Sequence, residues 1–397
     1  MALSLIALIL IACFRLRLRL PREALYMLIL PFAMIILGMI GAPGHDPRDI
    51  LKDVWYFSFG PLTVFAGYLL GRSSRPFEFS LFVFICAGIM LSLYQIGDFT
   101  AHRGLLQTED LNGLRDKIGG GYMLCILSPL ILFLSSHFGI KLPFLYSRRL
   151  RYGVYGVTFM GIATSFSRTL LLALVLAVVV GLGWLTKKRR RGIVAVAAVV
   201  LIFSGLSYIV PESQSSFLGK IARTQDELTF SDFRTEGDVI RYWRSYETLV
   251  AFETYARNNN FRRAIGMGFG QLVDIGMEVQ LGNDFMRYIP ILHNGYMYIL
   301  VKTGYLGLFA FFLFMGKLYS IGARHADSSC SSCQLIGGLV MSTVAIVVVS
   351  TFVISGWFNP VAMYPVVLLL GSALGMLAQR SAGRTCKSVE GFGVMES

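Results

Sequence analysis

Apolar residues run along most of this chain in stretches close to 20 residues long, and short polar connections separate the stretches. An α-helix needs about 20 apolar residues to cross the hydrocarbon core of a bilayer, which is ~30 Å thick. The pattern therefore predicts about eleven membrane-spanning helices, within a range of about ten to twelve. The expected spans are Ala2 to Phe14, Ala24 to Ala42, Val54 to Leu70, Phe77 to Ile96, Tyr122 to Phe138, Tyr152 to Phe166, Thr169 to Leu185, Ile193 to Val210, Asn294 to Ile321, Leu335 to Gly356 and Val361 to Ala378.

The predicted fold class is an all-α integral membrane protein, a polytopic helical bundle with one long polar connection. We expect an N-terminal bundle of about eight spans over residues 1–210, the polar connection over 211–290, further transmembrane helices over 291–379 and a tail over 380–397. Four arginines follow the short first stretch and no small-residue cleavage site does, so we interpret that stretch as a retained helix.

Composition and charge agree with a membrane protein and indicate its orientation. The chain is 55% hydrophobic and 15% charged, whereas soluble domains are about 25% charged. Its formal charge of +13 comes from basic residues that gather in alternate connections, which the positive-inside rule makes cytoplasmic. The polar connection 211–290 has balanced charge and is expected on the outer side of the membrane. This distribution predicts contact with membrane lipids and argues against nucleic acid as a partner.

The polar connection contains one amphipathic segment. Trp243, Tyr246 and Val250 recur there at helical spacing, which predicts a helix from about Asp238 to Tyr255. Such a helix is expected at the membrane surface.

Arginines and glycines gather on and after this helix. Arg241, Arg244 and Arg257 precede a glycine-rich turn that contains Gly268 and Gly270. Guanidinium groups hold phosphate through two hydrogen bonds, and glycines let a backbone approach a ligand. We predict that Arg244, Arg257, Gly268 and Gly270 bind a phosphate-bearing substrate. The alternative is an interfacial helix whose arginines meet lipid head groups.

Two polar groups interrupt the apolar pattern on the same expected side. Arg168 lies between two apolar stretches with almost no loop, and a charge at membrane depth usually faces a cavity or a partner. An arginine that snorkels to the interface is the alternative. His293 and Asn294 stand where the ninth span begins, so His293 is a candidate for proton transfer and Asn294 for substrate contact. A simple helix cap is the alternative for this histidine.

Several short motifs follow one another in a fixed order, and together they resemble the O-antigen ligase and polysaccharide polymerase superfamily. The resemblance covers about Tyr152 to Phe312 and the hydropathy of the remainder. The motifs are Ser167-Arg168, Arg241-Tyr242-Trp243, Gly266-Met267-Gly268-Phe269-Gly270, His293-Asn294-Gly295-Tyr296 and Lys302-Thr303-Gly304-Tyr305-Leu306-Gly307.

This resemblance implies a glycosyltransferase of the bacterial inner membrane, with a fold of the polyprenyl-phosphosugar-dependent (GT-C-like) type. Its active site would lie on the periplasmic face, and its donor would be a glycan linked to undecaprenyl diphosphate. Residue by residue, the membrane arginine of the family corresponds to Arg168, the loop arginine to Arg241 or its close rival Arg244, and the histidine to His293.

The candidate residues suit that chemistry. Breaking a bond between a sugar and a diphosphate builds negative charge on the departing oxygen, which fixed cations such as Arg168 and Arg241 stabilise. The attacking hydroxyl needs a proton acceptor, a role that an imidazole such as His293 performs with a gain of roughly 10²–10⁴-fold. The carboxylates that compete for this role are Asp238, Glu247 and Glu253.

A metal ion is not expected. Asp226 and Glu227 are the only adjacent acidic pair in the polar connection, and two adjacent carboxylates are a poor metal signature. Because several arginines are available to neutralise a diphosphate, we predict a metal-independent reaction without a cofactor.

Three functions stay open at the level of the sequence. The leading prediction is a polymerase of O-antigen or exopolysaccharide repeat units, which would work with other polysaccharide-assembly proteins. The second is the ligase that moves finished polymer onto lipid A core. Many ligases have an acidic residue before the glycine where this chain has Lys302-Thr303, which favours the polymerase. A transporter of lipid-linked sugar is the third, although few charges lie inside the spans to line a pathway.

Overall fold

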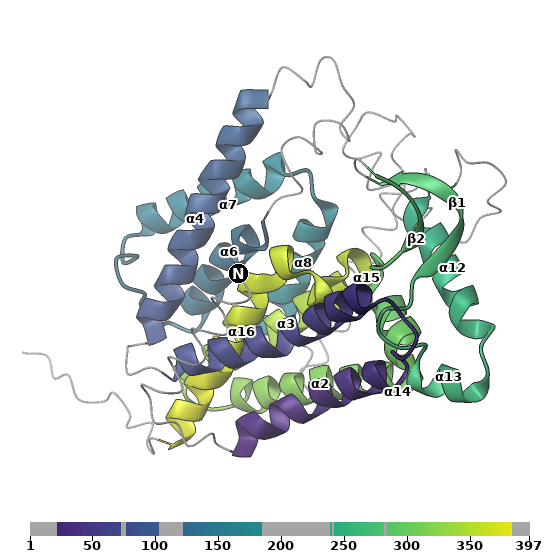
Figure 1. Cartoon of the computed structure of the whole chain (residues 1–397). Helices are drawn as coiled ribbons and strands as arrows, with labels where there is room; N and C mark the ends of the chain where they lie inside the picture. The colour runs from purple at the N-terminus through teal and green to yellow at the C-terminus, as the bar shows by residue number, and fades with distance from the viewer. Residues whose placement is uncertain are drawn as a thin grey trace, which may run out of the picture.

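The computed structural model describes residues 22–72, 77–102, 122–184, 239, 242–281 and 284–382 (Figure 1). These residues form a helical bundle with one small hairpin. The elements are α2 (Arg22–Ile40), α3 (Pro47–Gly71), α4 (Phe77–His102), α6 (Met123–His137), α7 (Arg148–Thr164), α8 (Arg168–Gly181), α12 (Trp243–Ala256), α13 (Asn260–Ile265), β1 (Val273–Leu281), β2 (Asp284–Ile289), α14 (Gly295–Ala326), α15 (Ser331–Ile354), the 3-10 helix η3 (Gly356–Phe358) and α16 (Pro360–Ala382).

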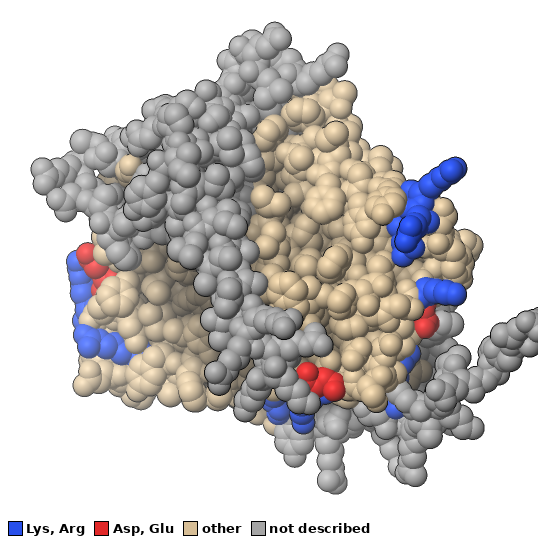
Figure 2. All heavy atoms as spheres, turned by 180° about the vertical axis from the view of Figure 1, so that it is seen from behind, with Lys and Arg blue, Asp and Glu red and all other residues tan. Residues whose placement is uncertain are grey.

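The helices are those of a multi-pass membrane protein. Among the described residues, α3, α4, α14, α15 and α16 are long and apolar enough to cross a bilayer, and α2, α6 and α8 contain shorter apolar segments. The expected spans at 2–14 and 193–210 lie outside the described residues, so the total of eleven stays a prediction. Charged side chains gather at the margins of the face seen in Figure 2, and a broad uncharged surface lies between them.

Close helix contacts in the bundle depend on small residues. Gly67 and Gly71 of α3 lie against Gly371 and Gly375 of α16, and a Cβ at Gly67 would collide with the carbonyl oxygen of residue 368. Small residues four apart let two helix backbones approach closely, which favours association in a membrane, where hydrophobic burial drives helix pairing little.

The all-α expectation is wrong for one segment of the polar connection. β1 and β2 form an antiparallel hairpin, in which Val273 pairs with Ile289 and the register shifts after Asp274. Val273, Ile275 and Val279 are buried, whereas Glu278 between the last two is exposed. Such alternation is typical of a strand with one covered face, and it is already visible in the sequence.

Helix α14 is interrupted near its start, where a continuous span was expected. Gly304 has φ 67° and ψ −172°, so the carbonyl groups of Val301 and Lys302 lose their helical donors. The glycine-rich turn replaces those donors: the amides of Met267 and Gly268 donate to the carbonyls of Val301 (2.8 Å) and Lys302 (3.1 Å). An irregular backbone at membrane depth is tolerated when protein groups satisfy it in this way.

Candidate functional site

A histidine and a buried carboxylate meet where α14 begins. Oε1 of Glu247 accepts the backbone N–H of His293 at 2.8 Å, and Oε2 lies 2.9 Å from Nδ1 of the same residue. The Glu247 side chain is 1% exposed and the His293 side chain 50% exposed. Asn294 caps α14, since its side chain accepts the N–H groups of Tyr296 and Met297. The imidazole is therefore held on one edge and open on the other.

This geometry assigns the two ring nitrogens of His293. The ionised form of the Glu247 carboxylate only accepts hydrogen bonds, and beside that form it is Nδ1 that carries the proton. Nε2 then carries the lone pair. A carboxylate behind a histidine fixes the tautomer and ring orientation and stabilises the imidazolium that forms on proton uptake. The pair is thus arranged for Nε2 to accept a proton.

Helix α12 carries Glu247 and is fixed from two sides. It packs on α14 and on β1, and α12, α13 and β1 lie on the right of Figure 1. The hydroxyl of Tyr246 donates to the carbonyl oxygen of Ile275 in β1 at 2.6 Å. Burial raises the pKa of Tyr246, and the nearby charges of Glu253 and Asp274 raise it further, so the phenol keeps its proton and the bond.

Arg244 lies on the same helix as Glu247, three residues before it and half-buried. Residues three apart are neighbours on a helix surface, so Arg244 and Glu247 share one face of α12. Arg241 lies outside the described residues. Of the two rival loop arginines, the structure thus describes only Arg244.

Helix α8 begins at Arg168 and runs antiparallel to α15. Ser342 of α15 donates its hydroxyl to the carbonyl oxygen of Ala177 at 2.6 Å, and Gly338 packs on Gly181. Because four residues forward on α15 correspond to four residues back on α8, Arg168 is level with position 351, near the end of α15.

That end of α15 adjoins the histidine. Ser355, which follows α15, donates its N–H to the carbonyl oxygen of His293. The start of α8, the end of α15 and the Glu247–His293 pair therefore lie at one end of the bundle. Ser167 caps α8 by accepting the N–H of Leu170, so the helix start that carries Arg168 is well defined.

Other predicted contact residues have partners within the protein. Arg257 is exposed and pairs with Glu253 at 2.8 Å. The amide of Gly268 donates to α14, and the amide of Gly270 donates to Oδ2 of Asp53 at 2.7 Å. Glycine permits this turn because both residues have positive φ. Their N–H groups donate hydrogen bonds within the protein.

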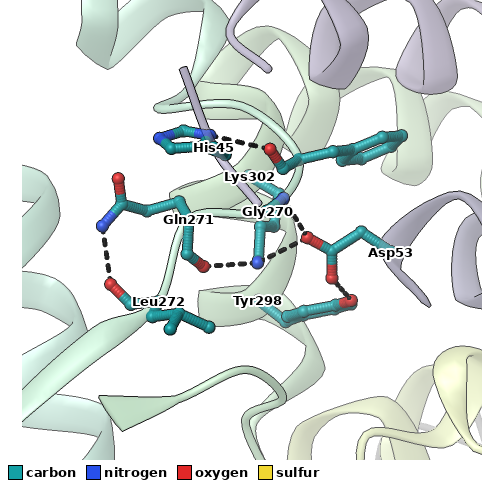
Figure 3. Close-up of polar contacts among 8 residues, drawn as sticks. His45, Asp53, Gly270, Gln271, Leu272, Tyr298 and Lys302 are labelled. Atoms are coloured by element: carbon teal, nitrogen blue, oxygen red, sulfur yellow. Dashed lines mark hydrogen bonds and ion pairs between the residues drawn. The ribbon is translucent and has the colours of Figure 1, made fainter. Parts of the chain in front are cut away.

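A buried ionic network contacts the glycine-rich turn (Figure 3). Nζ of Lys302 lies 2.6 Å from Oδ2 of Asp53 and also donates to the carbonyl oxygen of Gln271, while the hydroxyl of Tyr298 donates to Oδ1 of Asp53. Asp53 belongs to α3, and Lys302 and Tyr298 belong to the first part of α14. The network therefore ties α3, α14 and the turn before β1 together.

Sequence reasoning found His293 but missed this support. It treated Glu247 as a rival base, whereas the structure makes it the partner of His293. It also missed Asp53, which it left just before the span that begins at Val54, although Lys302 inside an apolar span is a signal for a buried partner. Within the described ranges, no group of three or more His, Cys, Asp or Glu side chains is arranged to hold a metal ion.

The fold and site define a multi-pass membrane protein with a histidine–glutamate pair and arginine-bearing helices at one end of its bundle. Residues 154–312 match the family described as O-antigen ligase, and this segment contains Arg168, Glu247 and His293. The match confirms the resemblance of this segment to the O-antigen ligase and polysaccharide polymerase superfamily. It supports a glycosyltransferase-type role in polysaccharide assembly. No curated protein matches the chain.

Proposed function

We propose that this protein is a glycosyltransferase on the periplasmic face of the bacterial inner membrane, which polymerises O-antigen or exopolysaccharide repeat units from an undecaprenyl-diphosphate-linked donor. The observation that carries this proposal is the Glu247–His293 pair, in which a buried carboxylate leaves Nε2 of a half-exposed imidazole free to act as a base. The pair lies at the same end of the bundle as the start of α8.

In the proposed reaction an acceptor hydroxyl attacks the anomeric carbon of the donor sugar. The carbon–oxygen bond to the diphosphate breaks, and the hydroxyl proton moves to Nε2 of His293. Glu247 stabilises the imidazolium that results. Arg168 and a loop arginine, either Arg244 or Arg241, stabilise the charge that develops on the departing diphosphate. These arginines replace a metal ion in this scheme.

The description of the matching family favours a second candidate, the ligase that transfers polymer to lipid A core. The preference for a polymerase came from Lys302 in place of an acidic residue. Lys302 is 2% exposed and paired with Asp53. The residue that differs from the ligases is therefore inside the bundle, where its side chain does not contact an acceptor. The acceptor must therefore decide between the two functions.

The test uses the full chain in nanodiscs with undecaprenyl-diphosphate-linked oligosaccharide repeat units as donor. In one arm the acceptor is a second copy of the same lipid-linked unit, and in the other it is lipid A core. A polymer ladder that stays lipid-linked supports the polymerase, and label on lipid A core supports the ligase. Transfer in neither arm, with both substrates bound, rejects a glycosyltransferase.

Variants separate catalysis from donor binding. His293→Ala is expected to lower turnover by about two to four orders of magnitude, with little change in affinity for the lipid diphosphate. Glu247→Gln should lower turnover less, and the double variant should be no slower than His293→Ala, because Glu247 acts through the histidine. Normal turnover of His293→Ala would remove the base from the scheme.

His102 offers a matched control. It lies on α4 with Nδ1 3.3 Å from a carboxylate oxygen of Asp98, so it is also a histidine–carboxylate pair. His102→Ala should leave both turnover and donor affinity unchanged.

A further inference from the structure

A cavity of about 340 Å³ lies between the end of α6, the connection after it and the first turn of α7. Ser135 and Ser136 line it from α6, Lys141 and Tyr146 from the connection, and Arg151 from α7. The connection folds back over the helix end, where the N–H of residue 140 donates to the carbonyl oxygen of Ser135 at 2.8 Å. The cavity is thus lined by hydroxyl groups, two cations and apolar side chains.

The cavity lies at the opposite end of α7 from the Glu247–His293 pair. Helix α7 ends at Thr164, only a few residues before Arg168, and begins at Arg148. Its 17 residues span about 25 Å at 1.5 Å per residue. In Figure 1, α6 and α7 lie on the other side of the view from α12 and α13. The cavity is therefore separate from the proposed catalytic site and lies at the other end of α7.

Positive charge is concentrated around this cavity, although the start of a helix usually favours negative charge. Arg148, Arg149 and Arg151 lie in the first four residues of α7, no acidic residue lies in its first turn, and no side chain caps it. Helix N-termini carry partial positive charge and favour anions. None of the described carboxylates forms an ion pair with these arginines or with Lys141. An anion bound here would relieve that repulsion.

One buried hydroxyl in the cavity wall also has no partner. Ser135 is 1% exposed and its Oγ makes no hydrogen bond. A buried polar group left unsatisfied costs about 1–3 kcal/mol, so natural proteins satisfy nearly all of them. A phosphate oxygen that enters the cavity is an acceptor of the kind that this hydroxyl lacks. The positive-inside rule alone would account for the basic residues, but it explains neither the cavity nor the unpartnered hydroxyl of Ser135.

Exposed aromatic side chains on the segments that line the cavity favour a lipid as its ligand. Tyr146 lines the cavity, Phe144 and Tyr152 are next in the chain to the lining residues Leu145 and Arg151, and all three aromatic side chains are about 70% exposed. The ring of Phe144 lies 5.3 Å from that of Phe82 on α4. Exposed aromatic rings beside basic residues are typical of the interface between lipid head groups and acyl chains. Basic pockets between transmembrane helices on the cytoplasmic side bind phospholipid head groups.

We propose that this cavity binds the phosphate-bearing head group of an anionic phospholipid from the leaflet opposite the catalytic site. Lys141, Arg151 and the first turn of α7 hold the phosphate, and the acyl chains lie along the exposed aromatic side chains. The proposal does not depend on the glycosyltransferase activity.

The test counts lipids bound to the purified full chain by native mass spectrometry, with phosphatidylglycerol and phosphatidylcholine as probes. Lys141→Gln with Arg151→Gln should weaken phosphatidylglycerol binding about 30-fold, at about 1 kcal/mol for each basic residue. Lys317→Gln with Arg324→Gln, on α14, removes the same charge and should weaken it less than threefold. Equal losses in the two pairs would overturn the proposal. Protection from heat by glycerol phosphate as strong as by the lipid would also overturn it, in favour of a free-anion site.

Ser135→Ala keeps the test decisive if the double variant folds poorly. Loss of an unsatisfied hydroxyl should raise the melting temperature of the delipidated protein, while the further rise caused by added phosphatidylglycerol should shrink. An unchanged rise with the lipid would show that Ser135 does not meet the head group and would refute its place in the site.

Discussion

The buried pair of Asp53 and Lys302 is expected to make each partner intolerant of neutralisation on its own. Nζ and Oδ2 lie 2.6 Å apart, and the two side chains are 1% and 2% exposed. At an effective dielectric constant of about 20, the attraction at that distance is about 6 kcal/mol. Removing each ion from water costs several kcal/mol, so the two effects nearly cancel. A charge left alone keeps its desolvation cost and loses the attraction.

Two single variants and their combination measure this balance. Asp53→Asn leaves the ammonium of Lys302 without a counterion, and Lys302→Met leaves the carboxylate of Asp53 with only the donors from Tyr298 and Gly270. Each change should lower the free energy of unfolding by about 3–5 kcal/mol. The double variant should lose several kcal/mol less than the sum, because it buries no uncompensated charge.

Unfolding in mixed micelles of increasing SDS content measures these free energies, with Trp357, 2% exposed, as the optical reporter. The control is the exposed pair of Glu253 and Arg257, where Glu253→Gln and Arg257→Met should each cost below about 1 kcal/mol. If the losses at Asp53 and Lys302 add within about 0.5 kcal/mol, the two charges are not coupled and the reasoning fails.

Three further predictions concern the helix break, the membrane arginine and the orientation. Gly304→Ala should lower the free energy of unfolding in the same micelles by at least about 1–3 kcal/mol, because its φ and ψ suit only glycine; Gly316→Ala, with open space around it in the same helix, should not destabilise. Arg168→Lys should lose most transfer activity at normal protein level, because lysine lacks the planar fork that grips two phosphate oxygens; retained product would favour snorkelling. In intact cells, a cysteine at Phe285 should react with an impermeant maleimide and one at Phe144 should not, and the reverse would place the site in the cytoplasm.

Hydropathy alone predicted most of the helices that the structure describes. The stretch from Tyr122 to Phe138 became α6 (Met123–His137), and the stretch from Leu335 to Gly356 became α15 (Ser331–Ile354). Helix α7 begins at Arg148, earlier than its apolar stretch, because the polar first turn continues the helix beyond the apolar region. Long apolar helices are predictable because burial of backbone polar groups in lipid leaves few other structures.

The break in α14 was not predictable from the residues around it. Gly304 looked like any glycine in an apolar stretch, and glycine is common in transmembrane helices. The break persists because the turn at Met267 and Gly268, more than 30 residues earlier, supplies the missing donors. Interrupted helices also occur in transporters, where they line a substrate site. In this protein the amides of Met267 and Gly268 occupy the break, so the interrupted helix does not support a transporter.

The site was only half predictable for a similar reason. A histidine at a helix start is visible in one sequence, but its partner Glu247 lies 46 residues away, and Asp53 lies 249 residues from Lys302. Charges in apolar spans indicate that partners exist and leave their identity open. The hairpin is a different case. The alternation from Val273 to Val279 is visible in the sequence, but it was not recognised as a strand within the long polar connection.

Two paths of contacts converge on His293 and explain why residues far from the chemistry should matter to it. One path runs through α12, where Glu247 holds the imidazole and the adjacent Tyr246 holds β1. The other runs from the first part of α14 through Asp53 to Gly270, which leads into β1. Because both paths meet in β1, they form a closed ring, and a shift in either one moves the carboxylate relative to the imidazole. A displacement of about 1 Å in a catalytic group costs roughly 10²-fold in rate. Changes at Asp53 that leave the protein folded should therefore lower turnover before they weaken donor binding.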